Sequence, residues 1–312
     1  MPKSTWGRAL STVAVALVLW YFGRSLVAQR AAIGSRWDEL HPAWGMLVIS
    51  GLVVLGSYAV LIETWRRTVM AWGRSIGWGD AARIWFVSNL GKYVPGKVWQ
   101  IGAMTVLAEQ SGVPAIAAVG SSLVVNLVNL LAGMLVVLVT AARLIEGASV
   151  IPMLAIATAS ALATPWLLPL LARLASSVLR RPIAEPSVPP SAIFLALAGC
   201  TVAWTMYGVA FRLLAAALFG ATSGTTASYV AVFTLSYLAG YVFLLSPGGL
   251  GAREEVLQRL LAATALHPVP DALLLIVVSR LWLTVLESVP GLLWLVFSRS
   301  PSAARTVPPP TS

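Results

Sequence analysis

Two stretches of this sequence place a Pro-Gly pair and basic residues inside otherwise apolar surroundings. The first runs from Gly91 to Trp99 (GKYVPGKVW), and the second runs from Ser246 to Glu254 (SPGGLGARE). Proline and glycine interrupt a helix, and a bilayer core tolerates broken backbone only where protein or a water-filled cavity surrounds it. Two such breaks, one in each half of a chain, indicate the central site of a transporter.

The chemistry that such breaks favour is the binding of phosphate. A helix that begins after a break points free N–H groups and about half a positive charge toward an anion. In the first motif, Lys92 and Lys97 add full charges and Tyr93 adds a hydroxyl donor, so we predict that they bind a lipid phosphate together with the backbone of Gly96. The alternative is that both lysines extend to the cytoplasmic headgroups of the bilayer.

In the second motif, Arg253 is the best single candidate for a phosphate ligand, because its planar fork matches phosphate oxygens. Gly248 and Gly249 belong to the tight turn before it and are predicted to contact the substrate through their backbone. Glu254 has two interpretations. It is an acid favoured at a helix N-terminus, or it has a role in transport, in which it pairs with Arg253 in the empty site or exchanges a proton.

Further polar residues interrupt the apolar segments. Arg280 is expected to face the interior, where it finds a partner and contacts the substrate, and Glu287 follows it by two helical turns. Asn126 and Asn129 share one helix face, so they either line a cavity or hydrogen-bond neighbouring helices. The candidates for lining the cavity are Asn89, Trp99, Asn126 and Asn129.

Enzyme chemistry has little support in the sequence. Residues 91–97 fit the pattern G-x-x-x-x-G-K of nucleotide-binding loops, but Val98 replaces the Ser or Thr that would hold magnesium, and Pro95 removes a backbone donor. The single cysteine, Cys200, excludes an internal disulfide, and the two histidines are far apart in sequence. We therefore predict no cofactor, no metal and no catalytic residue.

The composition is that of a membrane protein. Of the 312 residues, 58% are hydrophobic and only 10% are charged, whereas soluble domains carry about 25% charged residues. The net charge of +10 comes from basic residues at the edges of apolar runs, which is typical of topology signals and anionic-lipid contacts rather than of nucleic-acid binding. We predict one all-α polytopic domain over residues 1–298 and a disordered tail over 299–312.

The apolar pattern predicts the elements of this domain. Six segments are expected to cross the membrane: 9–27, 44–63, 114–141, 150–172, 192–219 and 270–297. Two interrupted segments, 81–110 and 226–266, are predicted to be re-entrant helical hairpins that enter from opposite sides. The alternative for the second is that its first arm, 226–245, crosses fully. The halves 44–141 and 192–297 then form an inverted repeat.

The distribution of Lys and Arg places the N-terminus in the cytoplasm of a multi-pass cell-membrane protein, with its first apolar run retained as a span. Most tryptophans, including Trp65, fall near predicted span ends and indicate an interfacial belt. Trp85 and Trp99 flank the first motif and are candidates for packing inside the protein.

At these motifs the chain resembles the flippase-like family that includes the transmembrane part of lysylphosphatidylglycerol synthases. The residues that carry the resemblance are Asn89, 91–99, 247–251, Arg253, Glu254 and Arg280. The resemblance covers residues 5–298 and implies a transporter or flippase for lipids with charged headgroups, often aminoacylated phospholipids or lipid-linked sugars. The soluble aminoacyl-transferase domain of the full synthases is missing from this sequence, so lysyl transfer is not expected.

We therefore expect a lipid flippase whose site lies at the tips of the two hairpins and whose partners are membrane lipids with anionic headgroups. Rocking of the two halves would expose the headgroup to each leaflet in turn. Two alternatives stay open. The first is a non-catalytic membrane partner of an envelope glycosyltransferase or lipid-modifying enzyme, and the second is an enzyme that acts on a lipid phosphate.

Overall fold

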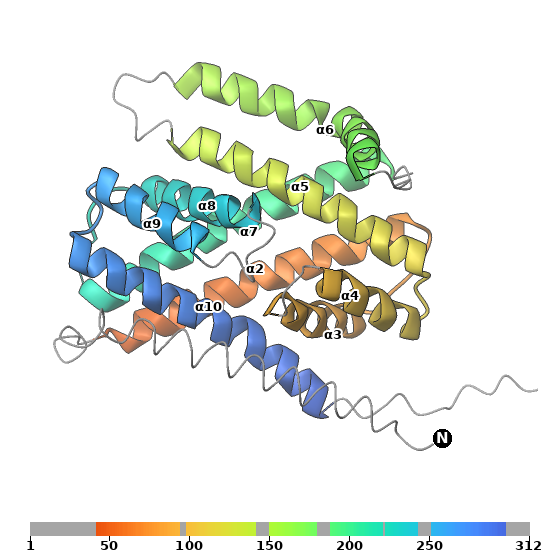
Figure 1. Ribbon diagram of the computed structural model, residues 1–312, viewed down its shortest axis with the longest axis horizontal. Helices are drawn as coiled ribbons and strands as arrows, with labels where there is room; N and C mark the ends of the chain where they lie inside the picture. The colour runs from red at the N-terminus through yellow and green to blue at the C-terminus, as the bar shows by residue number, and fades with distance from the viewer. Residues whose placement is uncertain are drawn as a thin grey trace, which may run out of the picture.

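The computed structural model describes residues 42–93, 98–141, 150–179, 188–220, 222–242 and 251–297. These residues form helices and turns, without a strand among them, which confirms the all-helical class (Figure 1). The elements are α2 (Trp44–Ala71), α3 (Trp78–Asn89), the 3-10 helix η1 (Leu90–Tyr93), α4 (Val98–Gln110), α5 (Ala115–Ala141), α6 (Val150–Leu179), α7 (Pro190–Phe219), α8 (Thr226–Val242), α9 (Ala252–Ala263) and α10 (Val269–Phe297).

Four of these helices are long and apolar enough to cross a bilayer: Trp44–Ala71, Ala115–Ala141, Pro190–Phe219 and Asp271–Phe297. Each exceeds the roughly 20 residues that a span requires. The predicted span 150–172 falls in α6, where the apolar stretch Leu154–Trp166 is shorter. The predicted span 9–27 and the predicted tail 299–312 lie outside the described residues.

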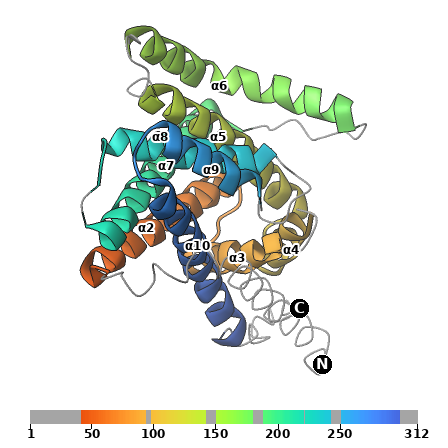
Figure 2. The same ribbon diagram turned by 60° about the vertical axis from the view of Figure 1, so that its left-hand side comes forward.

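Helices α2 and α7 pack along each other at the centre of the bundle. Small residues let the helices approach closely, as helix packing in lipid requires. A Cβ atom on Gly208 of α7 would collide with the backbone of Val230 in α8, and one on Gly51 of α2 would lie 2.7 Å from the Trp282 ring of α10. Helix α6 lies at the periphery against α5, and Figure 2 shows it apart from the central helices.

Two helix pairs, α3–α4 and α8–α9, lie at opposite ends of the bundle (Figure 1), and α8 is the longest of the four helices with 17 residues. Within each pair the two helices pack against each other. Helices α3 and α9 have 12 residues each, which corresponds to about 18 Å, well below the roughly 30 Å of a hydrocarbon core. The pairs also contact the long helix of the other half: α3 packs against α10, and α8 packs against α5.

Glycines allow the turns that shape these pairs. A Cβ on Gly91 in η1 would lie 2.9 Å from the backbone nitrogen of Gln100, so only glycine lets η1 touch the start of α4. Gly251 precedes α9 with a φ of +87°, a conformation that glycine adopts without strain. The Glu254 side chain then accepts a hydrogen bond from the Gly251 amide at 2.8 Å. This contact agrees with the interpretation of Glu254 as an acid at a helix N-terminus.

Candidate functional site

A cavity of about 180 Å³ lies between the two helix pairs. It is bounded by α2, α3, η1, α4, α5, α7, α8, α9 and α10, so both halves of the chain contribute to it. Its polar lining has charged side chains (Lys92, Arg253, Arg280 and Glu287) and carboxamides (Asn89, Gln100, Asn126 and Asn129). Aromatic side chains form much of the remaining wall: Tyr58, Trp65, Trp85, Trp204, Tyr207, Tyr237 and Tyr241.

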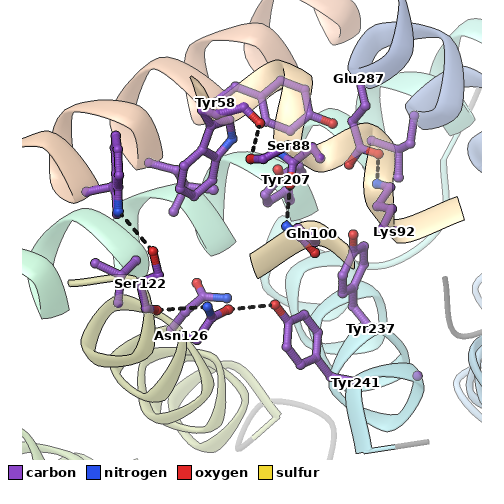
Figure 3. A pocket seen from close by; sticks show the side chains of 18 of the residues that line it. Tyr58, Ser88, Lys92, Gln100, Ser122, Asn126, Tyr207, Tyr237, Tyr241 and Glu287 are labelled. Carbon is purple, nitrogen blue, oxygen red and sulfur yellow. Dashed lines mark hydrogen bonds and ion pairs between the residues drawn. The ribbon is translucent and has the colours of Figure 1, made fainter. Parts of the chain in front are cut away.

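Two ion pairs connect helix α10 to the two helix pairs. Lys92 of η1 pairs with Glu287 (Figure 3). The Nη1 atom of Arg280 lies 2.9 Å from the Oε1 atom of Glu254 in α9. Arg280 and Glu287 are each only 7% exposed, and they lie two turns apart on one face of α10. The prediction that Arg280 faces the interior is confirmed.

Arg253 differs from these residues because no carboxylate in the described part of the chain pairs with it. Its side chain is buried, and its guanidinium carbon lies 4.3 Å from the ring centre of Tyr237 and 5.2 Å from that of Phe233. Its Nη2 atom is buried without a hydrogen-bond partner among the described residues. A buried donor without an acceptor is unfavourable, and a buried cation without an anion is more so. The cavity wall therefore contains a cation whose donors are available to an anionic ligand.

A second group of polar residues lies on α5 and α8. Figure 3 shows Tyr241 pointing toward Asn126, and its hydroxyl donates to the Asn126 Oδ1 atom at 3.0 Å. The amide nitrogen of Asn126 donates to the Ser122 carbonyl at 2.8 Å. Asn129, one turn farther along α5, lines the cavity, and its side chain makes no hydrogen bond to the residues the structure describes.

The aromatic wall is held by contacts between rings. Tyr207 stacks on Phe233 and on Tyr237, with ring centres 6.1 Å and 6.4 Å apart. Tyr58 meets the edge of Tyr207 at 5.9 Å, and Trp204 meets Tyr237 at 5.4 Å. Such packing fixes the rings and orients the face of Tyr237 toward Arg253.

The structure brings six of the predicted residues together around this cavity: Asn89, Lys92, Asn126, Asn129, Arg253 and Arg280. Glu254 joins them through its ion pair with Arg280, whereas the alternative interpretation paired it with Arg253. Five others are not described well enough to place. For Tyr93 the structure describes the backbone but not the side chain, and it does not describe Gly96, Lys97, Gly248 and Gly249. That the residues bind a headgroup stays a prediction.

Trp99 does not line the cavity and is 60% exposed. Helix α4 presents Gln100 and Met104 to the cavity instead. Neighbouring residues of a helix point about 100° apart, so the adjacent Trp99 points away. The prediction for this residue was wrong because the direction of the α4 face depends on how α4 packs against α5.

Trp65 also differs from its prediction. It is fully buried, lines the cavity and donates to the Ser122 hydroxyl at 3.2 Å. The interfacial interpretation assumed that the span ends at residue 63, whereas α2 continues to Ala71.

Sequence reasoning also missed the tyrosines of the wall. Their spacing on α8, where Tyr237 and Tyr241 lie one turn apart, was an available signal.

The described part of the chain has no group of three or more His, Cys, Asp or Glu side chains that could hold a metal ion.

The family model described as "Lysylphosphatidylglycerol synthase TM region" matches residues 8–291. That region is the non-catalytic part of the synthase. No curated protein matches the chain.

Proposed function

This chain belongs to the family of the lysylphosphatidylglycerol synthase transmembrane region, a family of membrane proteins involved in lipid handling, and we propose that it is a lipid flippase. It moves a lipid with an anionic or phosphate-containing headgroup between leaflets. The observation that carries the proposal is Arg253, a buried guanidinium in a cavity between two helix pairs, whose Nη2 atom has no hydrogen-bond partner among the described residues.

The charges around the cavity explain why Arg253 is the anchor for the headgroup. Within each of the pairs Lys92–Glu287 and Arg280–Glu254, the two opposite charges neutralise each other. One positive charge is then left among the described cavity residues, and it lies on Arg253. A phosphate can accept two hydrogen bonds from this guanidinium. It would thereby neutralise the buried charge that is unfavourable in the empty site.

The proposal includes an inverted repeat, and the helix packing supports it. Helices α2, α3, α4 and α5 correspond in order to α7, α8, α9 and α10. Each contact in the first set then has a counterpart: α4 against α5 matches α9 against α10, and α5 against α8 matches α10 against α3. The two first helices, α2 and α7, pack against each other, as elements beside a two-fold axis do.

The register of the cavity-lining residues gives independent support. Counted from the first residue of each helix, Tyr58 holds the same position in α2 as Trp204 holds in α7. Leu61 and Tyr207, one turn farther along these helices, match in the same way. The position of Asn126 in α5 likewise equals that of Arg280 in α10. Equivalent positions of the two halves therefore face one cavity.

The first arms of the helix pairs agree as well. The cavity residues of α3 precede Pro95, and those of α8 precede Pro247, at identical intervals. The matching residues, in order, are Trp85 with Tyr237, Ser88 with Gly240, and Asn89 with Tyr241. Chance would not readily produce the same spacing before both Pro-Gly motifs.

The two helix pairs are then re-entrant hairpins that approach the cavity from opposite sides of the membrane. The short lengths of α3, α4 and α9 support this topology. Because α10 pairs with both hairpins, through Glu287 and Arg280, a rocking movement that opens the cavity to one side must separate one of the two ion pairs. From the distribution of Lys and Arg, we place the protein in the cell membrane with its N-terminus in the cytoplasm.

The test is translocation of fluorescent phospholipid in proteoliposomes that contain the full chain. Arg253→Ala should lower the rate at least tenfold, and Arg253→Lys should recover little, because lysine lacks the planar fork. Arg259→Ala is the matched control, since Arg259 lies on the same helix with a side chain 78% exposed and paired with Glu255. If both alanine variants translocate at the wild-type rate, the site is wrong. If the wild-type protein does not translocate phospholipid, the function is wrong.

A further inference from the structure

The cavity has a charged end and an uncharged end. The charged end is formed by Lys92, Arg253, Arg280 and Glu287 from η1, α9 and α10, whereas the other end is formed by Ser122, Asn126, Asn129 and Tyr241 from α5 and α8. Figure 3 shows Lys92 and Glu287 on one side of the cavity and Ser122, Asn126 and Tyr241 on the other. A headgroup with its phosphate on Arg253 has room to extend toward the uncharged end.

An ammonium group on that headgroup would meet no suitable carboxylate among the cavity residues that the structure describes. Glu287 is the only acidic residue among the described residues that line the cavity, and it pairs with Lys92. Glu254 pairs with Arg280. A further cation would therefore either break an existing pair or stay unpaired in a membrane interior, and both are unfavourable.

The ring of Tyr237 in the aromatic wall does not offer a cation an alternative site. The face of Tyr237 is already occupied by the Arg253 guanidinium at 4.3 Å. A second cation over the neighbouring rings would be repelled by Arg253 at short range in a medium of low dielectric constant.

The uncharged end has the chemistry that hydroxyl groups need. The Asn129 carboxamide lines the cavity with no hydrogen bond to the described residues, so it presents both donors and an acceptor. A hydroxyl donates and accepts, and it matches such an amide without adding charge. The indole of Trp204 donates to the backbone carbonyl of Asn129 at 2.9 Å, which holds an apolar ring beside this position.

We infer that the cavity selects headgroups whose part beyond the phosphate is an uncharged polyhydroxyl group, such as glycerol or a sugar, and that it discriminates against headgroups with an ammonium. The inference rests on the proposed function, because it takes the phosphate to bind at Arg253. It assigns Asn129 as the residue that determines specificity.

The first experiment compares acyl-labelled phosphatidylglycerol, phosphatidylinositol, phosphatidylserine and phosphatidylethanolamine in proteoliposomes that contain the full chain. Phosphatidylserine is the charge-matched control, because it has the same net charge as phosphatidylglycerol but carries an ammonium. We expect the two polyhydroxyl lipids to move at least tenfold faster than the two amines. Equal rates for phosphatidylglycerol and phosphatidylserine, both lost in Arg253→Ala, would overturn the inference and leave the flippase intact.

The second experiment changes the uncharged end. Asn129→Asp supplies a carboxylate there and should raise the rate for phosphatidylethanolamine at least fivefold while lowering the rate for phosphatidylglycerol. Asn129→Leu removes the hydrogen bonds without adding charge and should lower the rates of the polyhydroxyl lipids to that of the amines. A gain of rate in Asn129→Asp cannot come from misfolding. An unchanged preference in both variants would remove Asn129 from the site.

A binding measurement separates selectivity from transport. Native mass spectrometry of the purified chain, incubated with equal amounts of phosphatidylglycerol and phosphatidylserine, should show at least a tenfold preference for the former. If this preference is found but no lipid is translocated, the flippase function is wrong and the selectivity stands. Equal binding of the two lipids would contradict the selectivity directly.

Discussion

Lys92 and Glu287 form an ion pair that joins η1, the turn between α3 and α4, to the last long helix. The side chains are 22% and 9% exposed, so little water surrounds the pair. Removing one partner leaves an uncompensated buried charge, which costs about 3–5 kcal/mol. We expect Lys92→Ala and Glu287→Ala each to lower the free energy of unfolding by that order, measured by denaturation in detergent.

The matched control for this pair is the double variant Lys92→Met/Glu287→Leu. Replacement of both charges by apolar side chains of similar size is often close to neutral, so the double variant should be more stable than either single one. Additive losses in the double variant would show that the two residues do not depend on each other.

The ring of Tyr237 is expected to position Arg253 through a cation–π contact of about 0.5–2 kcal/mol. Tyr237→Phe keeps the ring and should translocate phospholipid at nearly the wild-type rate. Tyr237→Leu removes the ring and should raise the lipid concentration needed for half-maximal transport severalfold. Equal loss in both variants would assign the effect to the hydroxyl group instead.

Gly91 should not tolerate a side chain. A Cβ there would lie 2.9 Å from the Gln100 nitrogen and 3.0 Å from its Cα, and neither backbone atom can move alone. Gly91→Ala should therefore destabilise the protein by about 1–3 kcal/mol, measured as a lower melting temperature. Gly102→Ala in α4 is the control, because its Cβ would meet nothing within 4 Å, and it should be neutral or stabilising by up to about 1 kcal/mol.

His267 lies in the connection between α9 and α10, outside the spanning helices, and should make stability depend on pH. Burial lowers the pKa of its imidazole below 6.5, although Asp271 opposes the shift. In the unfolded chain the imidazole takes up a proton near pH 6.5, whereas the folded protein resists protonation. Stability should therefore be full above pH 6.5 and fall as the pH is lowered toward the folded pKa.

The measurement for His267 is the melting temperature between pH 7.5 and 5. The Tyr229 hydroxyl lies 2.8 Å from the His267 Nε2 atom, so His267→Gln keeps a polar partner while removing the titration. The variant should lose the fall in melting temperature that the wild type shows below pH 6.5. An identical pH profile for both proteins would assign the acid sensitivity to other groups.

The helices could be predicted from the sequence because their signals are local. Long apolar runs indicated the spans at 44–63, 114–141, 192–219 and 270–297, and each corresponds to a helix that is long enough to cross a bilayer. An isolated Arg280 in such a run had to face the interior, since a bilayer offers it no other favourable place. A similarly local pairing holds for Glu63, which precedes Arg66 and Arg67 by three and four residues and lies 2.7 Å from each.

The arrangement of the cavity wall depended on packing between distant segments. Nothing local distinguishes Trp65, which lines the cavity, from Trp99, which is exposed, because both are tryptophans near the end of an apolar run. The same holds for the partners of the acids: Glu254 lies beside Arg253 in sequence but pairs with Arg280. Composition and local pattern thus decided the class of protein, the helices and the residues that must be buried. Only the crossing of helices far apart in the chain decided which buried cation has no carboxylate partner among the described residues, because that depends on which carboxylates reach it.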